Sequence, residues 1–173
     1  MTATAVGRAP VELPGVTLRS RAEGDDDFLL ALYVSTRGDV ALFGWDDATV
    51  RQFLVGQFGA QEQSYGTAHP AARSDVVLVG GVRAGRLLTD RRRERIDLVD
   101  VALLPEHRGR GIGNGLVRSL CREAADAGLP VRLQVRVGNP AEGLYERLGF
   151  VADRSTTASG APEMYRTMEW RAS

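Results

Sequence analysis

The stretch from Ile96 to Ala127 constrains the fold more than any other part of this sequence, because it predicts a strand, a glycine-rich turn and a long helix in succession. Residues 96–104 are mostly apolar and β-favouring, and Pro105 ends the strand because it has no backbone N–H to donate. Apolar residues then recur at helical spacing, at Leu116, Val117, Leu120 and Ala124. A strand that leads directly into an amphipathic helix predicts a sheet covered by helices.

The turn itself, residues 108–113, reads Arg-Gly-Arg-Gly-Ile-Gly. Backbone N–H groups at the start of a helix lack intrahelical partners and lie at the positive end of the helix dipole, so such a turn binds phosphate. The glycines let a phosphate approach the backbone without meeting a side chain. Neither the dinucleotide pattern G-x-G-x-x-G nor the triphosphate pattern G-x-x-x-x-G-K-[ST] fits, and the sequence contains no lysine.

The spacing Arg108-x-x-Gly111-x-Gly113 resembles the acyl-coenzyme A signature of the GNAT superfamily of N-acetyltransferases. A second segment, from Asn139 to Phe150, resembles the Asn…LYxxxGF segment that closes the same site in that family. The resemblance covers about residues 76–150. It implies an α/β (α+β) fold with a mixed, mostly antiparallel sheet flanked by helices, in the order βααβββαβαββ along the chain.

The remaining elements follow from local patterns. The expected strands are 16–21, 76–79, 85–89, 131–137, 150–151 and 163–171; the expected helices start at residues 25–27, at Asp46 or Asp47, and at Pro140. Gly80-Gly81 predicts a hairpin turn. The charge run Arg91–Arg95 predicts a solvated turn, with attraction of an acidic ligand as the alternative. Residues 154–162 read as a polar loop.

Length and composition limit the function further. The chain has 173 residues, 43% hydrophobic, with 22 basic and 22 acidic residues, which predicts one domain (16–173) after a disordered lead-in (1–15). The zero net charge argues against nucleic acid and membrane as partners. One cysteine, Cys121, and two histidines, His69 and His107, predict no metal centre. Without a signal-like or membrane-spanning apolar run, we expect a cytoplasmic protein; its arginine bias is typical of a GC-rich bacterial genome.

The resemblance implies acetyl-coenzyme A as cofactor. The family binds its pyrophosphate at the glycine turn, which here gives Arg108, Gly109, Arg110, Gly111, Ile112, Gly113 and Asn114. It holds the pantetheine arm at a strand edge, which here gives Val101, Ala102 and Leu103. An asparagine also contacts this arm, although Asn139 followed by Pro140 equally predicts a helix cap.

By resemblance, Tyr145 is the general acid that protonates the departing thiolate; a phenol with a pKa near ~10 is protonated at neutral pH. Packing between helix and sheet is the alternative role. Where one branch of the family has a glutamate base, this chain has Gln134, which cannot accept a proton. The preferred base is Asp97, at the position of the carboxylate in the histone-acetylating branch, with Asp100 second. In an unbulged strand Asp97, Val101 and Leu103 would share one face; pairing with an arginine is the alternative role of both carboxylates.

Gln57, Gln61 and Tyr65 form one stripe of the second helix, and we expect them, with Trp45 and His69, either to line the acceptor cleft or to be solvated. The predicted function is transfer of acetyl from acetyl-coenzyme A to a primary amine by direct attack, with a small molecule or amino acid as acceptor. The alternatives are a non-catalytic acyl-coenzyme A sensor, and an acetyltransferase that acts on a protein N-terminus or lysine. A homodimer is compatible with the resemblance, since the family often dimerises.

Overall fold

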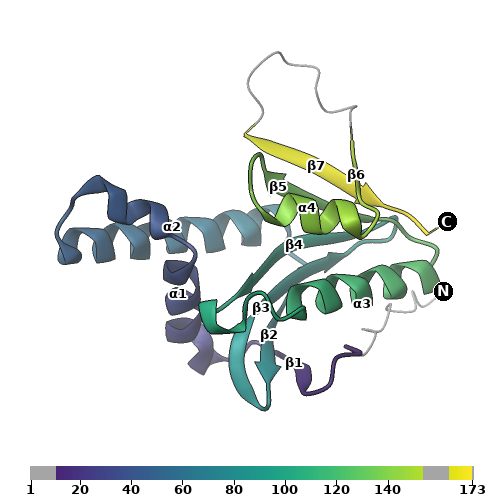
Figure 1. The fold of residues 1–173 in the computed structure, drawn as a ribbon, viewed down its shortest axis with the longest axis horizontal. Helices are drawn as coiled ribbons and strands as arrows, with labels where there is room; N and C mark the ends of the chain where they lie inside the picture. The colour runs from purple at the N-terminus through teal and green to yellow at the C-terminus, as the bar shows by residue number, and fades with distance from the viewer. Residues whose placement is uncertain (1–10, 154–163, 173) are drawn as a thin grey trace.

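The computed structural model describes residues 11–153 and 164–172, and these form a sheet of seven strands with helices on both faces (Figure 1). The strands are β1 (Val16–Ser20), β2 (Arg73–Val79), β3 (Val82–Arg91), β4 (Ile96–Leu103), β5 (Val131–Arg136), β6 (Val151–Ala152) and β7 (Tyr165–Trp170). The α-helices are α1 (Asp26–Ser35), α2 (Asp47–Ala68), α3 (Ile112–Asp126) and α4 (Ala141–Arg147). Three short 3₁₀ turns are η1 (Glu23–Asp25), η2 (Gly38–Phe43) and η3 (Pro105–His107).

The strands lie in the order β1-β2-β3-β4-β5-β7-β6, and each neighbouring pair is antiparallel except β4 with β5. This confirms the predicted fold class and the predicted order βααβββαβαββ. The parallel pair arises because the whole of α3 lies between β4 and β5 in the chain, and a crossover of this length is what a parallel pair requires.

The hairpin of β2 and β3 forms at the predicted glycines. Gly80 and Gly81 have φ of 58° and 83°, the left-handed conformation that a two-residue hairpin turn needs and that glycine adopts most easily. β3 is longer at both ends than the predicted strand 85–89 and includes Arg91. The predicted turn after it is therefore shorter than the charge run.

Helix α3 supplies the core on one face of the sheet. Its predicted apolar stripe, Leu116, Val117, Leu120 and Ala124, is at most 3% exposed and packs against β4 and β5. Leu13 also packs against this core, and a Cβ on Gly115 of α3 would lie 2.1 Å from the Leu13 Cδ1 atom. Residues 11–15 therefore belong to the fold, contrary to the predicted lead-in, whose first ten residues lie outside the described part of the chain.

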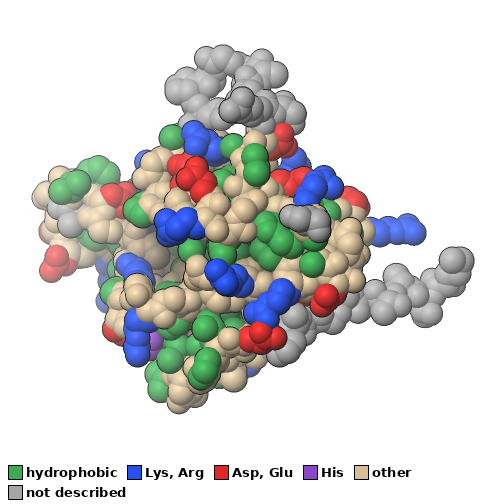
Figure 2. Space-filling model, turned by 45° about the vertical axis from the view of Figure 1, so that its right-hand side comes forward, with side chains coloured by type: hydrophobic (Ala, Val, Ile, Leu, Met, Phe, Trp, Pro, Cys, Tyr) green, Lys and Arg blue, Asp and Glu red, His purple; other side chains and the backbone are tan. Residues whose placement is uncertain are grey.

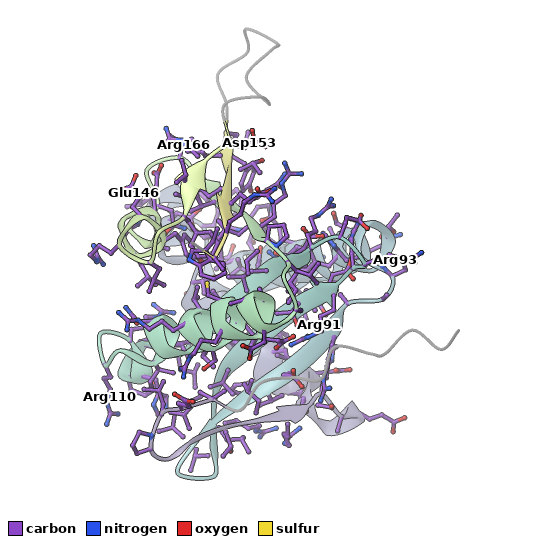
Figure 3. The ribbon with its side chains drawn as sticks, turned by 90° about the vertical axis from the view of Figure 1, so that its right-hand side faces the viewer. Arg91, Arg93, Arg110, Glu146, Asp153 and Arg166 are labelled. Atoms are coloured by element: carbon purple, nitrogen blue, oxygen red, sulfur yellow. The ribbon has the colours of Figure 1, made fainter. Side chains whose placement is uncertain are left out.

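The charge run Arg91–Arg95 is not simply solvated. Arg91 donates to Glu123 of α3 at 2.5 Å, and Arg95 donates to Asp97 at 2.8 Å, while Arg93 is exposed. Figure 3 shows Arg91 beside α3 and Arg93 at the periphery. The run therefore holds the end of β3 and the start of β4 to their neighbours. Sequence spacing could not reveal the partner of Arg91, because Glu123 lies 32 residues away.

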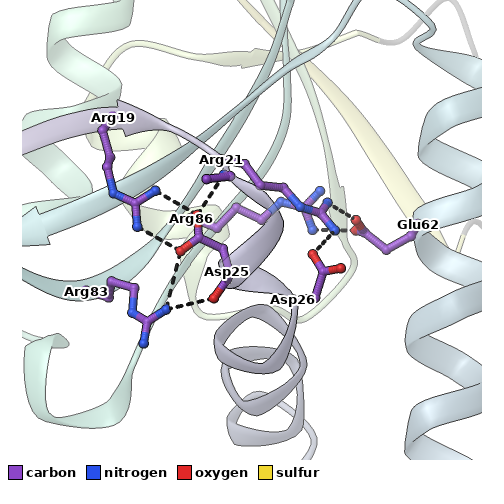
Figure 4. Close-up of polar contacts among 9 residues, drawn as sticks. Arg19, Arg21, Asp25, Asp26, Glu62, Arg83 and Arg86 are labelled. Carbon is purple, nitrogen blue, oxygen red and sulfur yellow. Dashed lines mark hydrogen bonds and ion pairs between the residues drawn. The ribbon is translucent and has the colours of Figure 1, made fainter.

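A buried carboxylate, Asp25, joins β1, η1 and β3 on the other side of the sheet (Figure 4). It accepts two hydrogen bonds of 2.7 Å from Arg19 and one of 2.8 Å from the Ala22 N–H. The bonds from Arg19 outweigh burial and lower the pKa of Asp25 well below its ordinary value. Because the folded pKa is depressed, the carboxylate stabilises the fold at neutral pH, and this stabilisation is lost as pH falls below about 4.

We expect Asp25→Asn to lower the Tm at pH 7 by several degrees, because the amide cannot replace the paired carboxylate between two arginines. The loss should shrink as the pH is lowered below 4, since the wild type then loses the same interaction. Thermal unfolding followed by circular dichroism from pH 7 to pH 2.5 measures both effects. Asp39→Asn is the control, because the Asp39 pair with Arg37 is exposed and such pairs contribute little.

Candidate active site

The site begins where β4 and β5 separate. The two strands pair only over residues 96–98 and 131–133, although β4 continues to Leu103 and β5 to Arg136. In the described part of the chain, the later residues of β4 therefore have no strand partner on the β5 side. Val101, Ala102 and Leu103 lie on this open edge, where an extended ligand can meet backbone hydrogen-bonding groups.

A β-bulge places the two candidate bases on the same face of the sheet. Leu88 pairs with Asp100 and Thr89 with Leu98, so Val99 is the extra residue of β4. Before the bulge Asp97 faces away from α3, and after it Asp100 does so too, whereas Val101 and Leu103 pack towards the α3 core. The shared face of Asp97, Val101 and Leu103, which was expected only for an unbulged strand, therefore does not form.

The glycine turn has the geometry expected of a phosphate cradle. Gly109 and Gly111 have φ of 70° and 77°, and the first helical bond runs from the Gly115 N–H to the Gly111 carbonyl at 3.0 Å. The N–H groups of Ile112, Gly113 and Asn114 precede that bond and have no acceptor among the described residues. They stand at the positive end of a helix of 15 residues, so the turn fits a pyrophosphate.

The two arginines of the turn behave differently. Arg108 donates from Nε to the Leu103 carbonyl at 2.7 Å and from Nη2 to the Ser35 hydroxyl at 3.0 Å, so its side chain ties the turn to β4 and α1. Arg110 is exposed at the amino-terminal end of α3, where Figure 3 shows it extending outwards. Of the two, Arg110 is therefore the side chain available to a phosphate, and Arg108 positions the turn.

Tyr145 of α4 has surroundings that bear on both of its expected roles, core packing and proton donation. It is 7% exposed, and its ring meets Phe150 edge-on with centroids 5.7 Å apart. Burial, with a smaller contribution from the negative charge of Asp100, raises the pKa of Tyr145 to about 12. The phenol is therefore protonated throughout the neutral range. Asn139 lies just before the same helix, and its side-chain oxygen accepts a 2.9 Å bond from the N–H of Ala141, the first residue of α4.

Asp97 and Asp100 differ in their surroundings. Asp97 is 6% exposed and forms ion pairs with Arg92 at 3.0 Å and Arg95 at 2.8 Å. Among the described residues, Asp100 pairs only with Arg86, at 3.9 Å between the Arg86 Nε and the Asp100 Oδ2. Burial raises the pKa of Asp100, and Arg86 only partly opposes this. Of the two carboxylates, Asp100 is thus the one whose environment favours taking up a proton.

Sequence reasoning missed the residues that hold Arg86 in place. Arg86 is 4% exposed, and its Nη1 donates to Glu62 of α2 at 2.5 Å. Glu62 also accepts from Arg21 at 2.6 Å, and Arg21 in turn donates to Asp26 (Figure 4). The available signal was Arg86 itself, a charged residue within an apolar strand, which can be buried only with partners.

The predicted acceptor stripe is only partly brought to the site. Gln61 shares a small cavity with Asp100, and burial followed by the charge of Asp100 raises the pKa of Tyr65. Gln57 instead accepts a 2.6 Å bond from Arg37. Trp45 packs edge-on against Phe53, with ring centroids 5.2 Å apart, and Figure 2 shows hydrophobic side chains gathered at this amino-terminal end of α2. Trp45 shares a hollow with Gln57, and Tyr65 does not line that hollow.

A hollow of about 380 Å³ lies on the α2 face of the sheet, next to the bulge. It is lined by Tyr65, Ala68, His69, Arg95, Asp97, Leu98, Val99, Arg132, Leu133, Gln134 and Thr167. His69 thus reaches the hollow as expected. The hollow and the glycine turn lie on opposite sides of the point where β4 and β5 separate.

His69, Asp90 and Asp97 also come close enough together to suggest a cation site. Arg92 is already among them, with its Nε 2.9 Å from Asp90 and 3.0 Å from Asp97 and its Nη2 3.1 Å from the His69 Nδ1. A bound metal ion would have to displace this guanidinium, so the cluster is internally neutralised.

Among the described residues, no helix is both long and apolar enough to cross a membrane.

The profile of the acetyltransferase (GNAT) family matches residues 29–150. The chain belongs to the GNAT acetyltransferase family. The match confirms the expected class, an acyltransferase, and covers the separated strands, the glycine turn and Tyr145 of this GNAT chain. No curated protein sequence matches it.

Solved GNAT structures share the fold at low identity. The PaiA N-acetyltransferase of Thermoplasma acidophilum, in complex with coenzyme A, is 12% identical with a TM-score of 0.64, over 91% of this chain and 99% of that one. An acetyltransferase from Salmonella typhimurium that modifies the N-terminal serine of ribosomal protein L7/L12 is 16% identical with a TM-score of 0.62, over 95% and 99%. Arabidopsis thaliana Naa50, in complex with the bisubstrate analogue CoA-Ac-MVNAL, is 13% identical with a TM-score of 0.57, over 91% and 99%.

Proposed function

We propose that this chain transfers the acetyl group of acetyl-coenzyme A to the primary amine of a small molecule. The observation that carries the proposal is the separation of β4 from β5, with the phosphate-binding turn on one side and Asp100 and the polar hollow on the other. A cofactor anchored at the turn can reach an acceptor in the hollow only through this opening. The coenzyme A complexes of two similar structures support the cofactor assignment.

The backbone of the site binds the cofactor, and a carboxylate acts as the base. The N–H groups of Ile112, Gly113 and Asn114 hold the pyrophosphate, and the edge formed by Val101, Ala102 and Leu103 holds the extended arm and polarises the thioester carbonyl. The cofactor supplies an activated thioester carbon. Asp100 takes a proton from the acceptor ammonium, directly or through a water, which frees the nitrogen lone pair.

The amine nitrogen then forms a bond to the acetyl carbon, the carbon–sulfur bond breaks, and Tyr145 gives its proton to the departing sulfur, while the new amide nitrogen loses its second proton to solvent. Solvent restores the phenol proton. An acyl-enzyme on Cys121 is disfavoured, because burial raises the pKa of that thiol to about 12 and leaves it protonated at neutral pH. Direct attack is therefore the mechanism that these residues support.

Two classes of acceptor have to be distinguished, a small-molecule amine and a protein N-terminus. Two of the similar structures belong to enzymes named for protein or peptide acceptors, which makes a protein N-terminus the second candidate. A small molecule is favoured by the modest hollow of about 380 Å³ and by Asp97, its only lining carboxylate, which is already paired with two arginines. Screening free amines and N-terminal peptides in parallel separates the two candidates.

Calorimetric titration with acetyl-coenzyme A tests the cofactor site. Micromolar binding is expected for the wild type, and Gly113→Val should weaken it at least tenfold, because a side chain there stands over the free N–H groups. The variant should fold normally, since a Cβ on Gly113 meets no atom within 4 Å. Gly59→Val on the exposed face of α2 is the matched control. Absence of binding by the wild-type chain would refute the proposal.

A further inference from the structure

The polar hollow beside the bulge carries more positive than negative side chains. Two arginines, Arg95 and Arg132, line it against one aspartate, Asp97, so its titratable lining carries a formal charge of +1 with His69 neutral. Asp97 pairs in register with Arg132 across β4 and β5, and Arg95 immediately precedes β4. The two guanidinium groups therefore lie on either side of the aspartate at one end of the hollow.

Both arginines keep donors for a ligand. Arg95 donates from Nε to Asp97 at 2.8 Å, and Arg132 donates from Nη2 to Asp153 at 2.7 Å. A guanidinium has five N–H donors, and these are the only side-chain hydrogen bonds that each arginine makes within the described residues. Their side chains are 27% and 32% exposed, so solvent or a ligand reaches them.

The opposite end of the hollow lies beside the β-bulge of β4. Val99, the bulged residue, lines it and is followed by Asp100, the proposed base. Gln134 and Thr167 pair across β5 and β7 and add uncharged polar groups along one wall. Asp100 itself lines a separate small cavity with Arg86 and Gln61, so a molecule in the hollow meets cations at one end and lies beside the residue that precedes the proposed base at the other.

We propose that the acceptor is an amine that also carries a carboxylate, of the size of an amino acid, with its carboxylate bound by Arg95 and Arg132. This inference rests on the acetyl transfer proposed above. Arginine forms paired, charge-assisted hydrogen bonds with carboxylates, which a neutral or cationic amine cannot use. A polyamine or a lysine-rich peptide would instead bring positive charge towards two arginines, and it would find Asp97 already neutralised by Arg92 and Arg95.

The experiment compares amines in pairs that differ only in the carboxylate. Each amino acid is assayed beside its decarboxylated amine and its methyl ester, with acetyl-coenzyme A saturating and free thiol release as the readout. We expect kcat/KM for at least one amino acid to exceed that of its amine and ester at least tenfold. Arg95→Gln and Arg132→Gln should raise KM for that amino acid about tenfold or more and remove most of its advantage over the amine and ester.

Arg93→Gln is the matched control, because Arg93 is exposed on the same turn and does not line the hollow. Arg132→Lys keeps the charge but loses the paired N–H donors of the guanidinium, so it should give an intermediate KM. Because lysine can still pair with Asp153, this variant is also the control for misfolding caused by the loss of that pair. Equal rates with and without the carboxylate overturn the inference while the transferase function stands. Thiol release with peptides alone, with acetyl-coenzyme A binding intact, also overturns it. Failure of acetyl-coenzyme A to bind would instead remove the proposed function itself.

Discussion

Replacing Tyr145 by phenylalanine is expected to lower kcat for acetyl transfer by about 10²–10⁴-fold, the usual contribution of general acid catalysis. The phenol is the group whose proton the departing thiolate needs, and its pKa of about 12 keeps that proton in place at neutral pH. Phenylalanine preserves the edge-on contact with Phe150 and the buried volume. The Kd for acetyl-coenzyme A and the Tm should therefore change little. Steady-state thiol release, with calorimetry and thermal unfolding on the same preparation, measures all three.

Tyr165→Phe is the control for this substitution, because Tyr165 is 55% exposed at the start of β7 and has no proposed part in the reaction. An unchanged kcat in the Tyr145 variant would leave the tyrosine with its packing role alone. Loss of cofactor binding together with activity would mean instead that the hydroxyl contributes to the cofactor site.

Much of this fold could be predicted because its decisive elements are local. The turn Arg108–Gly113 and the apolar stripe of α3 carry their own signals, and Gly80-Gly81 specifies the hairpin without reference to the rest of the chain. The class of fold then follows from the order of elements. The short-range bond of Asn139 was predictable for the same reason, since its partner, Ala141, is two residues away, although the residue that caps α4 is Pro140.

The arrangement of charges could not be predicted, because it depends on contacts between distant segments. Arg86 meets Glu62 from another element, and Arg91 meets Glu123 across 32 residues. The direction of the side chains along β4 could not be predicted for a different reason. A single extra residue, Val99, reverses which side chains face α3 in the second half of β4, and no residue type marks the position of the bulge. The sequence resemblance therefore placed Asp97 before Asp100 as the base, whereas the surroundings of the two carboxylates in the fold favour Asp100.

The same bulge leads to the second large effect, which is expected for Asp100→Asn. This substitution should lower kcat/KM about 10²–10⁴-fold, because the amide cannot accept the proton of the acceptor ammonium. In the wild type, burial raises the pKa of Asp100, so kcat/KM should fall as the pH drops through that raised value. The variant should lose this acidic limb. Initial rates from pH 4.5 to pH 9 with saturating acetyl-coenzyme A give both the magnitude and the profile.

The stability of Asp100→Asn should not fall together with its activity. A carboxylate whose pKa is raised in the folded state binds its proton more tightly there than in the unfolded chain, so its ionised form lowers the free energy of unfolding at pH 7. Removing that charge should keep or raise the Tm of Asp100→Asn. Asp97→Asn should lower the Tm, because it leaves Arg92 and Arg95 without a shared partner, and should largely retain the acidic limb. The reverse pattern, with the limb lost in Asp97→Asn and kept in Asp100→Asn, would make Asp97 the base, as the family resemblance alone implies.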